Sequence, residues 1–198
     1  MDAAADGERG LRVVLLGAPG SGKGTQAAIL STRWGVPAIS TGEMLREAVA
    51  AGSELGGRVA GVMATGELVE DGLMAEVVRE RLGRKDASLG FLLDGYPRTP
   101  LQACTLEGML KEADSELDAV VLLEVPEEVL VARAVARNRP DDRAEIVRER
   151  LRVYRERTEP LVGYYDERGL LRRIDGDRPV EEVTERILEA VAGSRTWC

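Results

Sequence analysis

Hydrophobic residues along the chain alternate between short unbroken runs and segments with helical spacing. Continuous apolar runs, typical of strands buried on both faces, cover residues 11–16, 91–93 and 119–125, and shorter candidates cover 37–40 and 170–174. Helical segments are predicted between them at 22–34, 42–50, 55–64, 71–82, 100–113, 126–137, 144–165 and 179–191. This alternation indicates an α/β fold: a five-stranded parallel sheet wrapped by helices, with ligands at the carboxyl ends of the strands.

The loop between the first strand and the first helix is rich in glycine, and reads Gly-Ala-Pro-Gly-Ser-Gly-Lys-Gly-Thr-Gln from Gly17 to Gln26. Successive glycines let the backbone turn its N–H groups inward, and the following helix adds the positive end of its dipole. Lys23 brings a mobile positive charge. The general phosphate-loop pattern has Ser or Thr directly after this lysine, whereas here Gly24 intervenes and the hydroxyl comes at Thr25. We expect nucleotide phosphates to bind here, in a fold of the P-loop NTPase type.

Composition narrows the remaining possibilities. The 198 residues suit one domain over 11–198, preceded by a tail over 1–10 that we expect to be disordered. A net charge of −8 argues against nucleic acid as a partner, and the chain lacks any apolar run long enough for a membrane span or a signal peptide. A cytoplasmic protein without membrane association is therefore expected, and a monomer is favoured because no large exposed apolar helix face is evident in the sequence. The absence of histidine excludes histidine acid–base catalysis, and two unpaired cysteines give no basis for a zinc site or a disulfide framework.

A second motif runs from Phe91 to Gln102, where an apolar strand ends in an acid. A carboxylate at the tip of a strand beside a phosphate loop can hold hydrated Mg²⁺ next to the phosphates, and Asp94 is placed to do so. Gly95 permits close approach of the backbone, and Arg98 offers a planar fork that matches a phosphate. An apolar strand that ends in Asp-Gly is by itself more often structural. Its place after a phosphate loop favours the magnesium interpretation.

Arginines in the last third of the chain form a third candidate group. Arg133 and Arg137 are four residues apart on one predicted helix, so two like charges share a face unless an anion lies between them. In the next helix Arg150 lies about 60° from the buried position Val147, and Arg143 is placed equally well by this test. For any one of these arginines, the pattern by itself favours a solvated surface charge.

The motifs together resemble those of adenylate kinases. The resemblance rests on the glycine-rich loop, residues 39–46, the tetrapeptide Gly66-Glu67-Leu68-Val69, residues 94–102 and Asp175-Gly176, and extends over roughly residues 11 to 191. It implies Mg²⁺-dependent, reversible phosphoryl transfer from ATP to AMP to give two ADP, with an AMP-binding segment at about 40–70 and a lid at about 133–143.

The resemblance also assigns site residues. ATP would be bound by Gly20, Ser21, Gly22, Lys23, Gly24, Thr25, Arg133, Arg137 and Arg178. AMP would be bound by Thr41, Arg46, Glu67, Leu68, Val69, Gly95, Tyr96, Pro97, Arg98, Gln102, Arg139 and Arg150, with the Gln102 amide reading the adenine edge. Lys23, Arg98, Arg133, Arg137, Arg139 and Arg150 would be catalytic, and Asp141 and Asp142 would orient arginines. A helix N-cap is a second interpretation of Thr41.

Departures from the family pattern are few. Only five residues separate Arg137 from Arg143, so this is a short lid without the cysteines that bind zinc in some relatives, and no zinc is expected. Arg178 stands where the family often has Lys, and its contact is expected through the main chain.

We expect the Tyr96–Pro97 bond to be cis, and truncation of Arg137, taken as an exposed lid side chain, to affect stability little. A UMP/CMP kinase and a non-catalytic ATP-binding sensor remain as alternatives; pyrimidine-specific relatives typically carry Asn where Gln102 stands.

Overall fold

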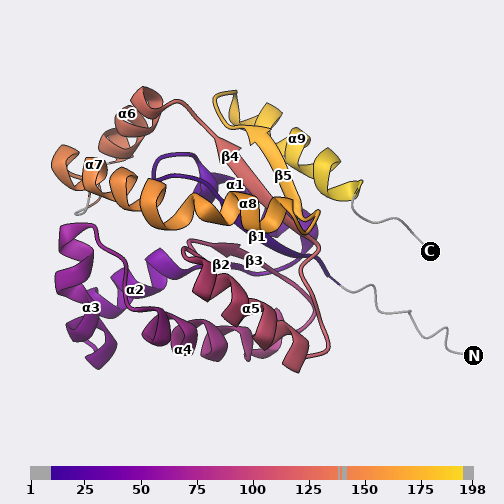
Figure 1. Ribbon diagram of the computed structural model, residues 1–198, viewed down its shortest axis with the longest axis horizontal. Helices are drawn as coiled ribbons and strands as arrows, with labels where there is room; N and C mark the ends of the chain where they lie inside the picture. Colours follow the sequence, from indigo (N-terminus) through magenta and orange to yellow (C-terminus); the bar gives the residue numbers. More distant parts are fainter. Residues whose placement is uncertain (1–9, 138, 140–141, 194–198) are drawn as a thin grey trace, which may run out of the picture.

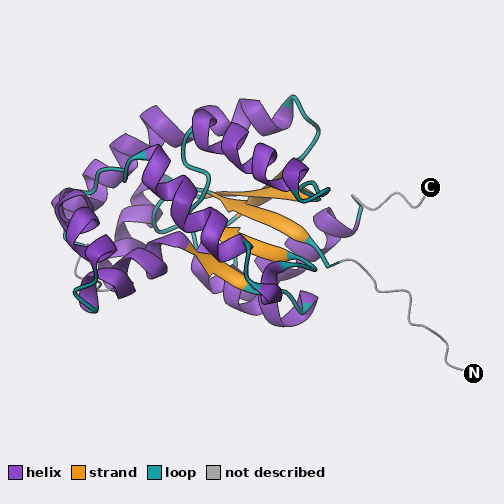
Figure 2. Cartoon of the chain, turned by 90° about the horizontal axis from the view of Figure 1, so that it is seen from below, coloured by secondary structure: helices purple, strands orange, loops and turns teal. Residues whose placement is uncertain are grey.

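The computed structural model describes residues 10–137, 139 and 142–193. Five strands form one parallel sheet in the order β2-β3-β1-β4-β5, with bounds β1 (Arg12–Leu16), β2 (Ala38–Ser40), β3 (Phe91–Asp94), β4 (Ala119–Glu124) and β5 (Leu171–Asp175). The helices are α1 (Lys23–Trp34), α2 (Thr41–Ala50), α3 (Glu54–Thr65), α4 (Asp71–Leu82), α5 (Pro100–Glu112), α6 (Glu127–Arg137), α7 (Ala144–Val153), α8 (Pro160–Asp166) and α9 (Val180–Ala192). Figures 1 and 2 show the sheet enclosed between these helices.

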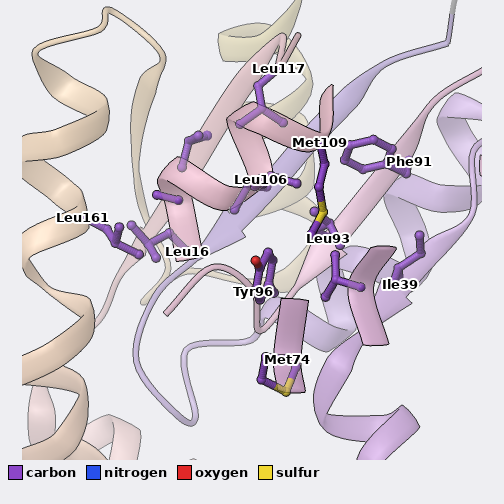
Figure 3. Close-up of a cluster of buried hydrophobic side chains, with 14 of the residues drawn as sticks. Leu16, Ile39, Met74, Phe91, Leu93, Tyr96, Leu106, Met109, Leu117 and Leu161 are labelled. Carbon is purple, nitrogen blue, oxygen red and sulfur yellow. The ribbon is translucent and has the colours of Figure 1, made fainter. Parts of the chain in front are cut away.

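The alternation of side chains along β1 separates two layers of core. Val13 and Leu15 face one side of the sheet, where they pack in a cluster with residues of α1 and α9. Val14 and Leu16 face the other side, in a larger cluster with residues of α4, α5 and α8 (Figure 3). Every residue of β1 is buried, which explains why the strand is apolar from Val13 to Leu16 after the charged Arg12. The predicted α/β sheet of five parallel strands is thus confirmed.

The sheet order places the site. The chain passes from β1 to β2 and β3 on one side, and then crosses to β4 and β5 on the other. Ligands bind at the carboxyl end of such a sheet, where the connections diverge. The register sets Asp94 beside both Leu15 and Ser40, so the tip of β3 lies between the ends of β1 and β2.

Local signals explain where several helices begin and end. The Ser53 hydroxyl accepts a hydrogen bond from the Gly56 N–H at 3.1 Å to cap α3, and the Thr99 hydroxyl accepts one from Gln102 N–H at 3.2 Å to cap α5. Pro100 then occupies the first turn of α5, where a missing N–H costs nothing. Most predicted bounds agree with the observed ones to within a residue or two.

The predicted single helix over 144–165 is wrong. The structure divides it into α7, a π-helical turn over Tyr154–Thr158 and α8. Pro160 cannot continue a regular helix, because it has no N–H and its ring clashes with the carbonyl group four residues earlier. The turn before it is widened: the Glu159 N–H donates to the carbonyl oxygen five residues earlier, that of Tyr154, at 2.9 Å. A 3₁₀ turn, η1 (Lys85–Ala87), was also not predicted.

Two further expectations can be compared with the structure. The Tyr96–Pro97 peptide bond is cis, as expected. None of the helices in the described part of the chain has the length and apolar character that crossing a bilayer requires. Residues 1–9 of the expected tail lie outside the described residues, as does Cys198, while Cys104 is a free, exposed thiol.

Candidate active site

The glycine-rich loop joins the end of β1 to α1 and requires glycine at particular positions. Gly17, Gly20 and Gly22 have φ values of 146°, 90° and 96°, which L side chains rarely adopt. A Cβ at Gly20 would also collide with the carbonyl oxygen of Leu130. Gly22 takes the N-cap position of α1 and supplies no side-chain cap, so the first N–H groups of the helix are left for another acceptor. This is the arrangement that binds phosphate.

Lys23 lies at the base of this loop. Its Nζ donates hydrogen bonds to the carbonyl oxygens of Gly17 at 2.7 Å and Ala18 at 3.0 Å. Burial lowers the pKa of Lys23 to about 8, and although the Asp94 carboxylate opposes this change, the positive charges of Arg98, Arg150 and Arg137 add to it. The ammonium therefore sits in a desolvated, cationic environment that a polyanion would relieve.

A cavity of about 560 Å³ opens above the loop. Among the described residues that line it, the charged side chains are those of Lys23, Glu43, Arg46, Asp94, Arg98, Arg133, Arg137, Arg139 and Arg150. Seven cations and two carboxylates thus meet in one cavity of a chain whose net charge is −8. This concentration of positive charge favours an anionic ligand. Figure 1 shows α2 and α3 facing α6 and α7 at this end of the molecule.

A smaller cavity of about 60 Å³ adjoins the first. Its lining combines apolar side chains such as Leu45 and Met74 with the polar groups of Thr41 and Gln102. Mixed linings of this kind suit a flat, largely apolar ring with a polar edge. Seven residues line both cavities: Gly42, Arg46, Gly66, Leu68, Gly95, Arg98 and Arg150.

The sequence-predicted residues divide among these cavities. The larger cavity is lined by Gly20, Gly22, Lys23, Gly24, Thr25, Arg46, Leu68, Asp94, Gly95, Pro97, Arg98, Arg133, Arg137, Arg139 and Arg150, and the smaller one adds Thr41, Glu67, Val69 and Gln102. Three of the residues assigned to ATP or AMP, namely Ser21, Tyr96 and Arg178, line neither.

Each of these three has a different environment. Ser21 is buried and its hydroxyl has no hydrogen-bond partner among the described residues, while its N–H donates to the Ala18 carbonyl oxygen. Tyr96 belongs to the core (Figure 3), where burial and the negative charge of Asp71 raise the pKa of Tyr96 to about 12. The Arg178 side chain pairs with Asp175 at 2.7 Å. Ser21 and Tyr96 can therefore reach a ligand only through their main chains.

The N-cap interpretation of Thr41 is wrong. Helix α2 begins at Thr41 itself, Ser40 holds the cap position, and the buried Thr41 hydroxyl donates to the Asp94 carbonyl oxygen at 3.4 Å. Gly95 follows with φ of 84°, and a Cβ there would meet both the Thr41 hydroxyl and the Arg98 guanidinium. The Arg98 Nε donates to the Gly95 carbonyl oxygen at 2.7 Å, so the side chain folds back over its own loop.

The like charges of Arg133 and Arg137 are separated by different acceptors. Arg133 donates to the Gly176 carbonyl oxygen and to the Asp177 carboxylate, both at 2.9 Å. Arg137 makes a two-point contact with Asp142, through Nε at 2.9 Å and Nη2 at 2.7 Å. These acceptors remove the repulsion that the i,i+4 spacing would otherwise produce.

Asp142 contacts three of the predicted arginines, Arg137, Arg139 and Arg150. Its side chain is only 1% exposed, and besides Arg137 it accepts from the Arg139 N–H at 3.1 Å and lies 3.4 Å from Arg150 Nη1. These contacts lower the pKa of the Asp142 carboxyl although burial opposes them. The prediction that Asp142 orients arginines is confirmed, whereas Asp141 lies outside the described residues. Because Arg137 is paired with a buried carboxylate, the expectation that its truncation leaves stability unaffected needs correction.

The structure also separates Arg150 from Arg143, which the sequence placed equally well. Arg150 lines both cavities, whereas Arg143 is exposed and lines neither. Val147 is buried as expected, together with Leu151 and Val153 of the same helix.

Thr158, Asp71 and Glu43 are among the residues near the cavities that sequence reasoning missed. Thr158 lines the larger cavity and donates to the Arg98 carbonyl oxygen at 2.9 Å, an approach that depends on the unpredicted π-helical turn. Asp71 contacts Gln102, and Glu43 lies 3.4 Å from Arg139 across the cavity. Asp71 and Glu43 look like ordinary acids in the first turns of helices, so no sequence signal marks them.

Comparison with known proteins identifies the family. The family model described as "Adenylate kinase" matches residues 15–170. The chain belongs to the adenylate kinase family. It is 50% identical to the adenylate kinase of Xanthomonas campestris pv. campestris over 185 residues, 91% of this chain and 99% of that protein. It is 48% identical to that of Thermobifida fusca (91% and 98%) and 44% identical to that of Kosmotoga olearia (90% and 98%).

Membership of this family makes the protein a phosphotransferase of nucleoside monophosphates. Adenylate kinases use ATP, generally with Mg²⁺. The Asp94 carboxylate lines the cavity beside Lys23, Gly24 and Thr25, and its Oδ2 accepts from the Ser40 hydroxyl at 3.3 Å. A single carboxylate beside a phosphate loop fits Mg²⁺, which keeps several waters and takes its other ligands from substrate phosphates.

Proposed function

We propose that this adenylate kinase catalyses reversible transfer of the terminal phosphoryl group of ATP to AMP, giving two ADP. The observation that carries the proposal is the shared wall of the two cavities. Arg98 and Arg150 line both the cavity above the phosphate loop and the smaller cavity beside Gln102. A phosphoryl group passing between two nucleotides would cross this shared wall.

The larger cavity is proposed to bind ATP. The backbone N–H groups from Gly20 to Thr25 would surround its phosphates, and the Lys23 ammonium would exchange its two carbonyl partners for phosphate oxygens. Arg133 and Arg137 would contact the outer phosphates. Arg178 would contribute through its main chain, because its side chain is engaged with Asp175.

The smaller cavity is proposed to bind the base of AMP. Gln102 would read the adenine edge, and the loop over residues 95–98 would hold the phosphate with Arg46 and Arg98. The remaining AMP contacts are assigned to Thr41, Glu67, Leu68, Val69, Gly95, Tyr96, Pro97, Arg139 and Arg150.

The chemistry requires alignment and neutralisation of charge. Because the AMP phosphate oxygen is already anionic, it needs no general base, which agrees with a chain that has no histidine. Lys23, Arg98, Arg133, Arg137, Arg139 and Arg150 would neutralise the charge that spreads over the transferred group. Magnesium, held through water by Asp94, would supply further positive charge at the phosphates.

Water has to be kept from accepting the phosphoryl group. The lid residue Arg139 and the α7 residue Arg150 already approach the AMP-binding side: Arg139 lies 3.4 Å from Glu43, and the Arg150 side chain would touch a Cβ at Gly66. These contacts would let the segment 133–143 close over both nucleotides together with the segment 40–70.

A coupled assay for ADP tests the proposal. ADP should form from ATP with AMP as acceptor, and much more slowly with UMP, CMP or no acceptor. Lys23→Met should nearly abolish turnover, because it removes a charged phosphate contact worth about 1.5–3 kcal/mol in binding and more in the transition state. The matched control is Lys111→Met, at an exposed lysine that lines neither cavity. Faster turnover of UMP or CMP, or ATP binding without turnover, would favour the alternative functions.

We further propose a cytoplasmic monomer without zinc and without nucleic-acid or membrane partners. Among the described residues, the exposed large hydrophobic side chains, Val49, Leu89, Leu101, Val135 and Val180, come from separate segments. Light scattering after size-exclusion chromatography tests the monomer, and a dimer at micromolar concentration would contradict it.

A further inference from the structure

The amide of Gln102 is held at both ends by protein groups. Its Oε1 accepts a hydrogen bond from the Arg98 main-chain N–H at 2.7 Å, and its Nε2 donates one to the Asp71 Oδ1 at 2.7 Å. The Gln102 residue is only 2% exposed. Asp71 is the first residue of α4, and it reaches Gln102 in the first turn of α5 from a different part of the chain.

The chemistry of these partners fixes which end of the amide is which. A main-chain N–H can only donate, so the atom that faces Arg98 must be the amide oxygen. A carboxylate accepts, so the atom that faces Asp71 must be the amide nitrogen. After these two bonds the oxygen keeps one lone pair and the nitrogen keeps one hydrogen. Those two remaining groups are what the amide can present to a ligand in the smaller cavity.

Asp71 is itself fixed. Its second oxygen, Oδ2, accepts from the Thr99 hydroxyl at 3.1 Å, and the same hydroxyl accepts from the Gln102 N–H as the cap of α5. The carboxylate therefore bridges the first turn of α5 and the amide that this turn carries. A free glutamine amide can turn end over end about its last torsion, which has two broad minima, but this one would lose both bonds by doing so.

A fixed amide can distinguish two classes of purine. Adenine presents an amino donor next to the acceptor N1, whereas hypoxanthine and guanine present the acceptor O6 next to an N1–H donor. A glutamine amide that turns freely can pair with either edge. One held in a single orientation pairs with only one of them, and the other edge meets donor against donor and acceptor against acceptor.

We propose that Asp71 is a positioning residue that fixes the orientation of the Gln102 amide and so selects 6-amino over 6-oxo purine monophosphates. The inference rests on the proposed function, in which Gln102 reads the base. Asp71 lines neither cavity, so it acts through Gln102 and not on the substrate directly.

The test compares AMP with IMP, because the two differ at the edge in question while IMP lacks the extra 2-amino group of GMP. In Asp71→Ala the amide loses one of its two fixed partners. The ratio of kcat/KM for AMP to that for IMP should fall by about tenfold or more, mainly through KM, while kcat for AMP stays within about threefold of the wild type. Asp71→Asn, which keeps the shape and one acceptor oxygen, should give an intermediate ratio and covers the case that the alanine variant does not fold.

Two controls separate the proposal from its alternatives. Glu181→Gln removes another first-turn acid, in α9, and should leave the ratio unchanged. Gln102→Leu tests the base-reading role itself: it should lower kcat/KM for AMP about tenfold or more and abolish most of the AMP/IMP preference.

The outcomes are distinguishable. The role of Asp71 is refuted, and that of Gln102 stands, if Gln102→Leu removes the AMP/IMP preference while both Asp71 variants retain it within about twofold. The same conclusion follows if the Asp71 variants lose stability together with an equal share of their activities toward AMP and IMP. If Gln102→Leu retains the preference, or the wild type does not discriminate between AMP and IMP, base reading lies elsewhere and the proposed role of Gln102 fails first.

Discussion

The replacement of Lys23 by methionine should change the pH dependence of stability in a defined way. In the folded protein, burial and three arginines lower the pKa of Lys23 to about 8 from an ordinary value of 10.5. At about 1.4 kcal/mol for each tenfold change in proton affinity, this difference corresponds to about 3 kcal/mol. The charged Lys23 ammonium therefore destabilises the folded protein by about this amount, and it places a cation under the nucleotide site.

The sign follows from where the proton is held. Below pH 8 the folded and unfolded chains are both protonated at Lys23, and the fold carries the whole cost. Between pH 8 and 10.5 the unfolded chain still binds the proton while the folded chain releases it, so stability rises with pH. The free energy of unfolding of the wild type relative to Lys23→Met should therefore increase by about 3 kcal/mol between pH 7.5 and pH 10.5.

Urea unfolding of both proteins at a series of pH values measures this difference. At each pH the free energy of unfolding of Lys23→Met is subtracted from that of the wild type, so the contributions of the other titrating groups cancel. The two hydrogen bonds that methionine loses, to the carbonyl oxygens of Gly17 and Ala18, are counted for the charged lysine and add the same offset at every pH. Lys111→Met serves as the control for the loss of one lysine charge. A difference that stays constant to within about 0.5 kcal/mol over the whole range would refute the reasoning.

Three further perturbations test other parts of the site. Arg137→Ala should reduce turnover about 10³-fold. It should also lower the free energy of unfolding by about 1–3 kcal/mol, because the buried Asp142 carboxylate loses its two-point partner. Adding Asp142→Asn should recover stability but not turnover, and an Arg137→Ala protein as stable as the wild type would contradict this. Gly20→Ala should lose about 1–3 kcal/mol more stability in thermal unfolding than Gly22→Ala, since both glycines have positive φ but only a Cβ at Gly20 meets a carbonyl oxygen, from α6; equal losses would count against the clash. Asp94→Asn should raise the Mg²⁺ concentration needed for half-maximal activity, and an unchanged requirement in a magnesium titration would exclude a magnesium role for this carboxylate.

Local and periodic features of the fold could be predicted from the sequence. The unbroken apolar runs of β3 and β4 could be predicted because a strand covered on both faces has few polar positions to interrupt the run. The partly exposed strands β2 and β5 have shorter apolar patterns, which were still enough to place them. The single helix predicted over 144–165 failed because apolar spacing continues through Pro160, and periodicity does not register a widened turn. The cavity-lining arginines could not be chosen by pattern: helical spacing from the buried Val147 places Arg143 and Arg150 equally well.

The sequence by itself determined the parallel α/β fold, the phosphate loop and the likeness to adenylate kinases, because each depends on residues close together in the chain. Only the tertiary structure decided which side chains control one another across long separations. It brings Asp71 to Gln102, Thr158 to the Arg98 carbonyl oxygen and Glu43 to Arg139. The physical reason is that a charge or a hydroxyl on a helix has no preferred partner in the sequence. Its partner is set by which buried donor or acceptor the packed elements leave within about 3 Å of it.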